Sequence, residues 1–158
     1  MIYMALKIGD LAPKFELVDT ELNIITMDEF QGKKLMLVFF VAADSPVCKK
    51  EICTFQKYLN QISNLNVQLL GISNDGPFAN KAFADKYDIK FPILGDYTST
   101  TIKKYGVLMK DLLHIKNYNA AKRSIFIINE KGIIVYIWIS DDPLVEPKYD
   151  KIKEFLEQ

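Results

Sequence analysis

Residues 34–57, KLMLVFFVAADSPVCKKEICTFQK, decide the fold of this chain. They open with a continuous apolar run, residues 35–42, which is typical of a strand covered on both faces. Ser45 and Pro46 then predict a helix start, with Ser45 as the N-cap and Pro46 as the first helical residue. Cys48 would be the third helical residue, in a first turn whose backbone N–H groups have no partners within the helix.

The predicted position of Cys48 favours chemistry at its sulfur. The positive end of the helix dipole and the free N–H groups both help a thiol to lose its proton. The preceding strand would place this cysteine at the carboxyl edge of an open α/β sheet, where such folds carry their active sites. Cys48 is therefore a candidate nucleophile. The alternative is a small buried core residue, the commoner place for a free cysteine.

The composition is that of an ordinary globular protein. A length of 158 residues predicts a single domain spanning residues 1–158. Twenty basic residues balance twenty acidic ones, so no nucleic-acid or membrane-surface partner is indicated. No apolar run approaches the roughly 20 residues of a membrane helix, and residues 1–7 lack the pattern of a signal peptide. Two cysteines without an export signal indicate a reducing, cytoplasmic setting.

The remaining chain alternates between strand and helix patterns. The order around a cysteine at the first crossover predicts an α/β fold: a thioredoxin-like core with a mixed central sheet, an N-terminal β-hairpin extension and an inserted helix. We expect apolar spacing on one helix to involve Phe78, Ala82, Phe83 and Tyr87. Residues 106–118 give no clear pattern. The expected strands are 15–18, 24–27, 67–73, 91–94, 124–128 and 133–139, and the expected helices are 28–32, 46–64, 78–87, 98–105 and 147–157.

Three further residues could assist Cys48. The Ser45 hydroxyl could bond the sulfur or a bound oxygen in addition to capping the helix. Arg123 is the only arginine beside nineteen lysines, which hints at a site that needs a planar, permanently charged fork of donors; the alternative is chance. Glu51, one turn after Cys48, is either a solvated carboxylate or a partner for an arginine or a backbone amide.

Cys53 follows Cys48 by five residues. On an ideal helix this spacing gives a rise of about 7.5 Å and places the two side chains on different faces. A disulfide needs Cα atoms about 4.4–6.8 Å apart, so the pair could bridge only if the first turns unwind. Cys53 is either a resolving cysteine that works through local unfolding or a buried helix residue. The single histidine, His114, is interpreted as structural, and two cysteines with one distant histidine make a poor zinc ligand set.

Taken together, these residues resemble the peroxiredoxin family, and its PrxQ or bacterioferritin-comigratory-protein branch most closely. The resemblance covers nearly the whole chain. It is carried by the opening KIGDLAPKFEL at 7–17, LVFF at 37–40, SPVCKKEICTF at 45–55, GIS at 71–73, KRSIFIIN at 122–129 and YIW at 136–138.

The resemblance implies roles for particular residues. Cys48 matches the peroxidatic cysteine, Cys53 the resolving cysteine, Ser45 the active-site hydroxyl and Arg123 the active-site arginine. Val41 stands where the family has a proline that shields the thiolate, and we expect it to line the peroxide pocket with Val47 and Glu51. Asp44 stands where the family has an uncharged residue, and a carboxylate beside the sulfur would oppose thiolate formation.

The implied function is a thiol peroxidase for hydrogen peroxide and small organic hydroperoxides, needing no metal or cofactor. The Cys48 thiolate would become a sulfenic acid, Cys53 would convert it to a disulfide, and a thioredoxin-like reductant would restore the dithiol. The resemblance also allows a homodimer, with Phe78 or Trp138 at its surface. Because of Val41 and Asp44, the alternative is a redox sensor or interaction module with weak peroxidase activity. A thiol–disulfide oxidoreductase is less well supported, since the cysteines are not spaced C-x-x-C.

Overall fold

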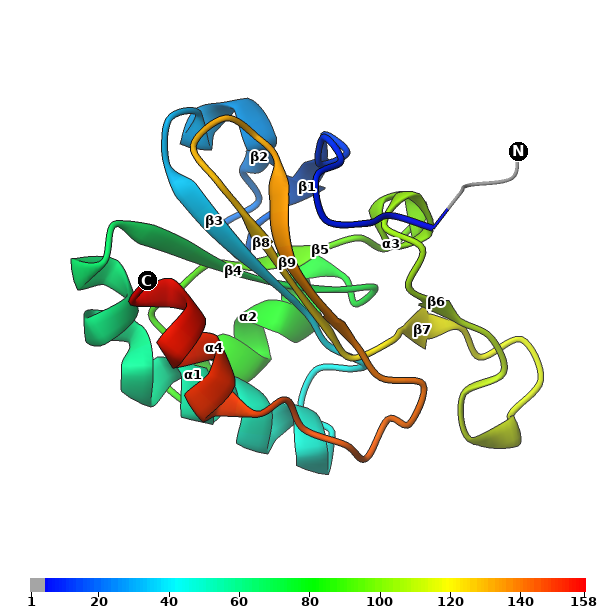
Figure 1. Ribbon diagram of the computed structural model, residues 1–158. Helices are drawn as coiled ribbons and strands as arrows, with labels where there is room; N and C mark the ends of the chain where they lie inside the picture. Colours follow the sequence, from blue (N-terminus) through cyan, green and yellow to red (C-terminus); the bar gives the residue numbers. More distant parts are fainter. Residues whose placement is uncertain (1–4) are drawn as a thin grey trace.

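A computed structural model describes residues 5–158, and it places one mixed sheet between layers of helices (Figure 1). The strands of this sheet are β1 (Glu16–Val18), β2 (Ile24–Thr26), β3 (Lys34–Phe39), β4 (Val67–Ser73), β5 (Ile93–Gly95), β8 (Ser124–Ile128) and β9 (Ile134–Ile139). Their order is β2-β1-β5-β4-β3-β8-β9. β3, β4 and β5 are parallel, and the other neighbours are antiparallel, as predicted for a mixed sheet.

The helices follow the predicted order. They are the 3-10 turns η1 (Met27–Phe30) and η2 (Leu112–His114) and the α-helices α1 (Pro46–Asn64), α2 (Pro77–Lys86), α3 (Thr100–Lys104) and α4 (Tyr149–Leu156). α1 begins at Pro46 with Ser45 as its N-cap, so Cys48 is its third residue, as the sequence predicted. No helix in the described residues is long and apolar enough to cross a membrane. Residues 1–4, part of the segment inspected for an export signal, lie outside the described residues.

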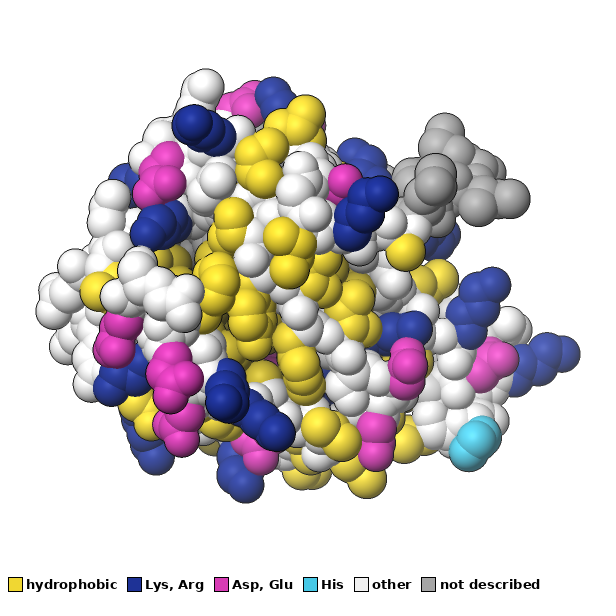
Figure 2. Space-filling view, viewed as in Figure 1, with side chains coloured by type: hydrophobic (Ala, Val, Ile, Leu, Met, Phe, Trp, Pro, Cys, Tyr) yellow, Lys and Arg dark blue, Asp and Glu magenta, His cyan; other side chains and the backbone are white. Residues whose placement is uncertain are grey.

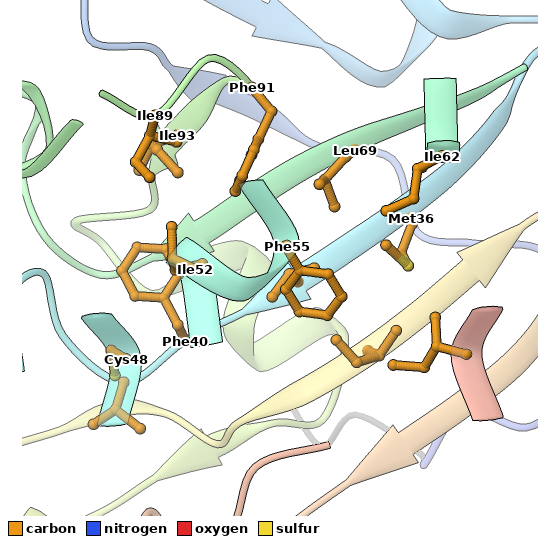
Figure 3. Packing of buried hydrophobic residues seen from close by; sticks show 14 of the residues in the cluster. Met36, Phe40, Cys48, Ile52, Phe55, Ile62, Leu69, Ile89, Phe91 and Ile93 are labelled. Carbon is orange, nitrogen blue, oxygen red and sulfur yellow. The ribbon is translucent and has the colours of Figure 1, made fainter. Parts of the chain in front are cut away.

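β3 explains why one apolar run organises the chain. Its alternate side chains enter two separate hydrophobic clusters on the two faces of the sheet. Met36, Val38 and Phe40 join the cluster beneath α1, α2 and α4, where Cys48 also lies (Figure 3). Leu35 and the other odd-numbered residues of the strand join the second cluster, which includes residues of α3 and the N-terminal segment. A strand buried on both faces carries no polar position, which accounts for the unbroken pattern.

The predicted inward face of α2 was partly wrong. Phe78 is 79% exposed and Ala82 is also exposed, whereas Asn80 and Phe83 are buried. Helix α2 packs on β5 through this Asn80–Phe83 side. Phe78 lies only two positions before Asn80, which puts it on the opposite side of the helix.

The segment without a readable pattern contains a second, two-stranded sheet, β6 (Leu108–Met109) with β7 (Ala120–Ala121). Between these strands lies an exposed loop with residues in the left-handed backbone region: Asp111, Leu113, His114 and Asn117. Strands of two residues give no periodicity, and left-handed backbone at a leucine has no local sequence signal. The face in Figure 2 shows acidic and basic side chains interspersed, with His114 on this loop.

Candidate active site

The pairing of β3 with β8 brings Arg123 close to Cys48. Phe39, the last residue of β3, pairs with Ser124, the first residue of β8, in antiparallel register. Arg123 therefore lies beside the carboxyl end of β3, where the chain turns toward α1 and Cys48. Residues 75 positions apart in the sequence thus become neighbours.

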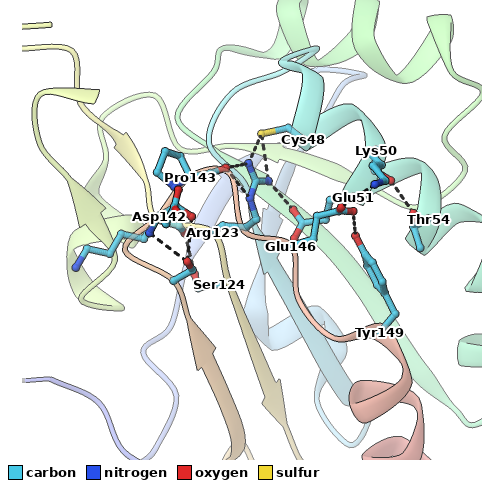
Figure 4. Close-up of polar contacts among 12 residues, drawn as sticks. Cys48, Lys50, Glu51, Thr54, Arg123, Ser124, Asp142, Pro143, Glu146 and Tyr149 are labelled. Carbon is cyan, nitrogen blue, oxygen red and sulfur yellow. Dashed lines mark hydrogen bonds and ion pairs between the residues drawn. The ribbon is translucent and has the colours of Figure 1, made fainter. Parts of the chain in front are cut away.

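Cys48 and Arg123 are in direct contact in the interior. The sulfur is 3.3 Å from each of the two terminal guanidinium nitrogens, Nη1 and Nη2. Cys48 is 0% exposed and Arg123 1% exposed, so this contact is shielded from water. Figure 4 shows the guanidinium directed at the sulfur from the β8 side. A pair of charge-assisted donors in a dry site stabilises a negative sulfur far more than a solvated pair would.

The helix start supplies further donors. The amide groups of Val47 and Cys48 make no backbone or side-chain hydrogen bond within residues 5–158. The first amide of α1 that is satisfied is that of Lys49, which donates to the Ser45 carbonyl over 2.8 Å. These free N–H groups and the dipole of a 19-residue helix favour an anion at the Cys48 position.

Arg123 is held in place from its other side by the segment that follows β9. Its Nε and Nη2 atoms donate to the Pro143 carbonyl over 3.2 and 2.7 Å. Burial disfavours the guanidinium charge, but Glu51 and Cys48 outweigh this and raise the pKa of Arg123. Arg123 is therefore a fixed, permanently charged group. A lysine could not make this set of contacts, because it lacks the planar fork.

Glu51 is the second acidic group, after Cys48, that is hydrogen-bonded to Arg123. Its Oε1 accepts from Arg123 Nη1 over 3.0 Å, and the side chain is fully buried. Burial, which outweighs the attraction of Arg123, raises the pKa of Glu51 to about 8. Of the two alternatives in the sequence analysis, partner of an arginine and solvated carboxylate, the structure shows the first.

A shell of polar groups lies next to Glu51. Glu146 accepts a hydrogen bond from the Tyr149 hydroxyl over 2.6 Å and pairs with Lys50 over 3.1 Å (Figure 4). Burial acts against the Glu146 charge, but Tyr149 and Lys50 outweigh it and lower the pKa of Glu146. This carboxylate therefore stays ionised close to Glu51.

Ser45 occupies the predicted N-cap position without making the predicted side-chain bond. Its backbone is extended, but its hydroxyl caps no amide, and no hydrogen bond joins it to Cys48. The Ser45 hydroxyl is thus uncommitted in the described part of the chain. It remains free to bond another oxygen.

Asp44 is tied to α2. Its carboxylate accepts from Lys86 Nζ over 2.9 Å and from the Tyr87 hydroxyl over 2.6 Å. These two bonds lower the pKa of Asp44, and the bond from Tyr87 has the larger effect. Its charge is therefore paired with a cation, which reduces the expected opposition to a thiolate at Cys48. Asp44 also adopts a left-handed backbone, φ 62°, which aspartate tolerates better than most residues.

The remaining candidates lie around this centre. Val41 is buried in the hydrophobic cluster that contains Cys48, and Val47, the residue before Cys48 in the chain, is half-buried. Cys53 is half-buried, and both cysteines are free thiols on an unbroken helix. Burial, partly offset by Lys49 and Lys57, raises the pKa of Cys53.

His114 is exposed on the β6–β7 loop and contacts none of these groups. Among the described residues there is no group of three histidine, cysteine or acidic side chains that could hold a metal ion.

Pro143, Glu146 and Tyr149 were not predicted from the sequence as residues of the site. A backbone carbonyl such as that of Pro143 has no sequence signal. Glu146 directly precedes the predicted helix 147–157 and Tyr149 lies in its first turn, but nothing in the sequence indicated that this helix would reach the site.

Comparison with known proteins bears on the family and the fold of this chain. A sequence model of the AhpC/TSA family matches residues 8–137. The chain is 36% identical over 135 residues to the putative peroxiredoxin bcp of Coxiella burnetii, covering 85% of this chain and 89% of that protein. It is 29% identical over 153 residues to peroxiredoxin Bcp of Escherichia coli, covering 97% of each. A solved peroxiredoxin-like protein from Aquifex aeolicus matches 99% of this chain and 89% of its own at 25% identity, with a TM-score of 0.87. The predicted thioredoxin-like fold is thereby confirmed.

Proposed function

The chain belongs to the AhpC/TSA family, in its Bcp/PrxQ peroxiredoxin branch, and from this premise we propose that Cys48 is the cysteine through which it reduces peroxides. Peroxiredoxins of this kind are thiol-dependent peroxidases, and this chain is one of them. The observation that carries the assignment to Cys48 is the pair of Arg123 donors, each 3.3 Å from the sulfur. Cys53 has no comparable donor in the described residues.

The proposed first half-reaction is an attack on the peroxide. The Cys48 thiolate attacks the terminal oxygen of the hydroperoxide, the O–O bond breaks, and the sulfur becomes a sulfenic acid. Arg123, the Ser45 hydroxyl and the free amides of Val47 and Cys48 stabilise charge on the leaving oxygen. We propose Val41 and Val47 as apolar walls beside the sulfur. Full burial of Cys48 favours hydrogen peroxide and small organic hydroperoxides as substrates.

The proposed second half-reaction uses Cys53. After the start of α1 unwinds, the Cys53 thiol loses its proton and its sulfur attacks the Cys48 sulfur; the S–O bond breaks, and the leaving hydroxide takes up a proton and departs as water, giving a disulfide. A thioredoxin-like reductant then restores both thiols by exchange. The support is that two free thiols lie five residues apart near one end of a helix. None of these steps needs a metal or a cofactor.

The setting of this activity is part of the proposal. Two free thiols and a thioredoxin-like reductant suit a reducing, cytoplasmic compartment. A single domain over residues 1–158 is also part of the proposal; its support is that, in the described part of the chain, both hydrophobic clusters lie on one sheet and together draw on residues from Ala12 to Leu156. A homodimer could use the exposed Phe78 or the half-buried Trp138, and sedimentation of the wild type and Phe78→Ser would test this.

A coupled assay tests the proposal. The wild type, thioredoxin, thioredoxin reductase and NADPH are mixed with hydrogen peroxide, and NADPH consumption is followed. We expect turnover by the wild type and none by Cys48→Ser; turnover that persists in Cys48→Ser would reject the assignment. A sensor with weak peroxidase activity is the alternative, favoured by Val41 at the position of the family's proline. It would show oxidation of Cys48 without sustained turnover.

A further inference from the structure

The Arg123 guanidinium donates hydrogen bonds to two buried acidic groups in this site. Arg123 Nη1 donates both to Cys48 Sγ over 3.3 Å and to Glu51 Oε1 over 3.0 Å. Both acids are 0% exposed. Cys48 and Glu51 are therefore separated by a single shared nitrogen, out of contact with water.

The charge balance allows only one of these acids to be ionised at low cost. With Arg123 positive, a site that holds both a thiolate and a carboxylate would carry an uncompensated negative charge in the interior. The second Glu51 oxygen, Oε2, has no hydrogen-bond partner in the described residues. An ionised oxygen without a donor is far more costly to bury than a neutral hydroxyl without an acceptor.

Of the other groups facing Glu51, the Glu146 carboxylate opposes its ionisation and Arg123 favours it. Arg123 directly precedes β8, Glu146 lies in the segment after β9, and Tyr149 is the first residue of α4. Of these only Arg123 is a cation, and it is shared with the sulfur. Lys50 is committed to Glu146. The raised pKa of Glu51 agrees with this geometry.

We propose that Glu51 holds the proton lost by Cys48 and delivers it to the leaving oxygen of the peroxide. This inference rests on the proposed peroxidase function. In the resting site, Cys48 is a thiolate and Glu51 is protonated, and both accept hydrogen bonds from Arg123. The free Oε2–H is the proton that the leaving group receives.

The step balances in atoms, electrons and charge. A sulfur lone pair of Cys48 forms a bond to the terminal peroxide oxygen, which keeps its hydrogen. The O–O bond breaks, its electron pair stays on the leaving alkoxide or hydroxide, and that oxygen takes the Glu51 proton. The sulfur is oxidised to a sulfenic acid, the peroxide is reduced to an alcohol or water, and Glu51 becomes a carboxylate paired with Arg123. The site is neutral before and after, so no net charge develops in the interior.

Infrared difference spectroscopy tests this on the intact protein. Cys53→Ser, which stops the reaction at the sulfenic acid, is treated with one equivalent of hydrogen peroxide at neutral pH. We expect the carbonyl band of one protonated carboxyl group to disappear as a carboxylate band appears. Glu51→Gln in the same background should lack this change, and Glu146→Gln, the neighbouring acid that is already ionised, should keep it.

Kinetics give an independent readout. The rate constant for Cys48 oxidation by hydrogen peroxide should fall about 100-fold in Glu51→Gln, the scale of a lost proton donor. In the protein with Glu51, this rate should also decline as the pH rises through about 8, because Glu51 then loses its proton. Glu51→Gln should lack that decline. If Glu51 had only a structural role, its replacement would lower the rate without removing the decline.

The outcomes separate the two claims. If Cys48 is oxidised while no carboxyl band is lost, the role of Glu51 is wrong and the proposed peroxidase stands. The infrared result does not depend on whether Glu51→Gln folds. If hydrogen peroxide leaves Cys48 reduced, both claims fail.

Discussion

Phe39 and Ser124 are direct partners in the antiparallel register of β3 and β8, and this pairing positions Arg123 at Cys48. The strand that delivers the cysteine and the strand that delivers the arginine are neighbours in the sheet. A shift of one residue in this register would turn Arg123 to the opposite face of the sheet. The site therefore depends on the same hydrophobic pattern that fixes the core.

Arg123→Lys should slow the oxidation of Cys48 by hydrogen peroxide about 100-fold. The change keeps a positive charge but removes the paired donors on the sulfur, and loss of one oriented donor costs roughly 10²–10³ in rate. Stopped-flow kinetics would measure this. The matched control is Lys122→Ala, a neighbour whose ion pair with Asp141 lies at the surface. A rate for Arg123→Lys within threefold of the wild type would count against the role of the guanidinium.

Cys53→Ser should stop turnover with thioredoxin and leave one round of Cys48 oxidation. Cys53 is the only other cysteine, so its loss removes the partner for an intramolecular disulfide. Mass spectrometry of the peroxide-treated wild type should show the loss of two hydrogens, and Cys53→Ser should not. If the treated wild type shows no such loss, Cys53 is not the resolving cysteine.

Asp44→Asn should change the rate of Cys48 oxidation by less than about threefold. The Asp44 carboxylate is exposed and paired with Lys86 and Tyr87, so its charge is already screened at the site. Asparagine also tolerates the left-handed backbone at this position. A tenfold faster reaction in Asp44→Asn would instead show that this carboxylate suppresses the thiolate, as the sequence alone suggested.

Glu51 and Glu146 should affect stability with opposite dependence on pH. The pKa of Glu51 is raised, so between its unfolded value and about 8 the folded state holds a proton that the unfolded chain has lost. In Cys48→Ser, which has no Cys48 thiolate to offset this proton, the free energy of unfolding then falls as the pH rises through this window, by at most about 1.4 kcal/mol per pH unit. The pKa of Glu146 is lowered, so its contribution is present above the unfolded value and is lost as the pH falls.

Urea unfolding of Cys48→Ser with and without Glu51→Gln, and of the wild type and Glu146→Gln, between about pH 3 and 8 would measure this. Relative to Cys48→Ser alone, the variant that also carries Glu51→Gln should lack the loss of stability toward pH 8. An unchanged slope in Glu51→Gln would show that Glu51 is ionised throughout.

Local signals predicted the centre of the molecule well. The apolar run at β3, the N-cap at Ser45 and the place of Cys48 in the first turn of α1 all follow from residue type and spacing, and the structure has them. Arg123 was a candidate because it is the only arginine. Its contact with Cys48 depends on strand order and register, which no local pattern encodes.

The parts that could not be predicted depend on tertiary packing. The position of Arg123 beside Glu51 depends on the segment after β9, whose Pro143 carbonyl accepts a hydrogen bond from Arg123. The orientation of α2 was misjudged because a buried polar residue, Asn80, lies on its inner face while Phe78 is exposed. Hydrophobicity alone therefore predicted Phe83 correctly but wrongly grouped the exposed Phe78 and Ala82 with it.

The most direct test of the central claim compares the two thiols of this chain one at a time. Cys53→Ser leaves Cys48 alone, and Cys48→Ser leaves Cys53 alone. Exposure alone would make the half-buried Cys53 react faster than the fully buried Cys48. We predict the reverse: the rate constant with hydrogen peroxide should be at least about 100-fold higher for Cys53→Ser, because Arg123 and the start of α1 activate Cys48. Equal rates, or a faster reaction of Cys48→Ser, would contradict the account.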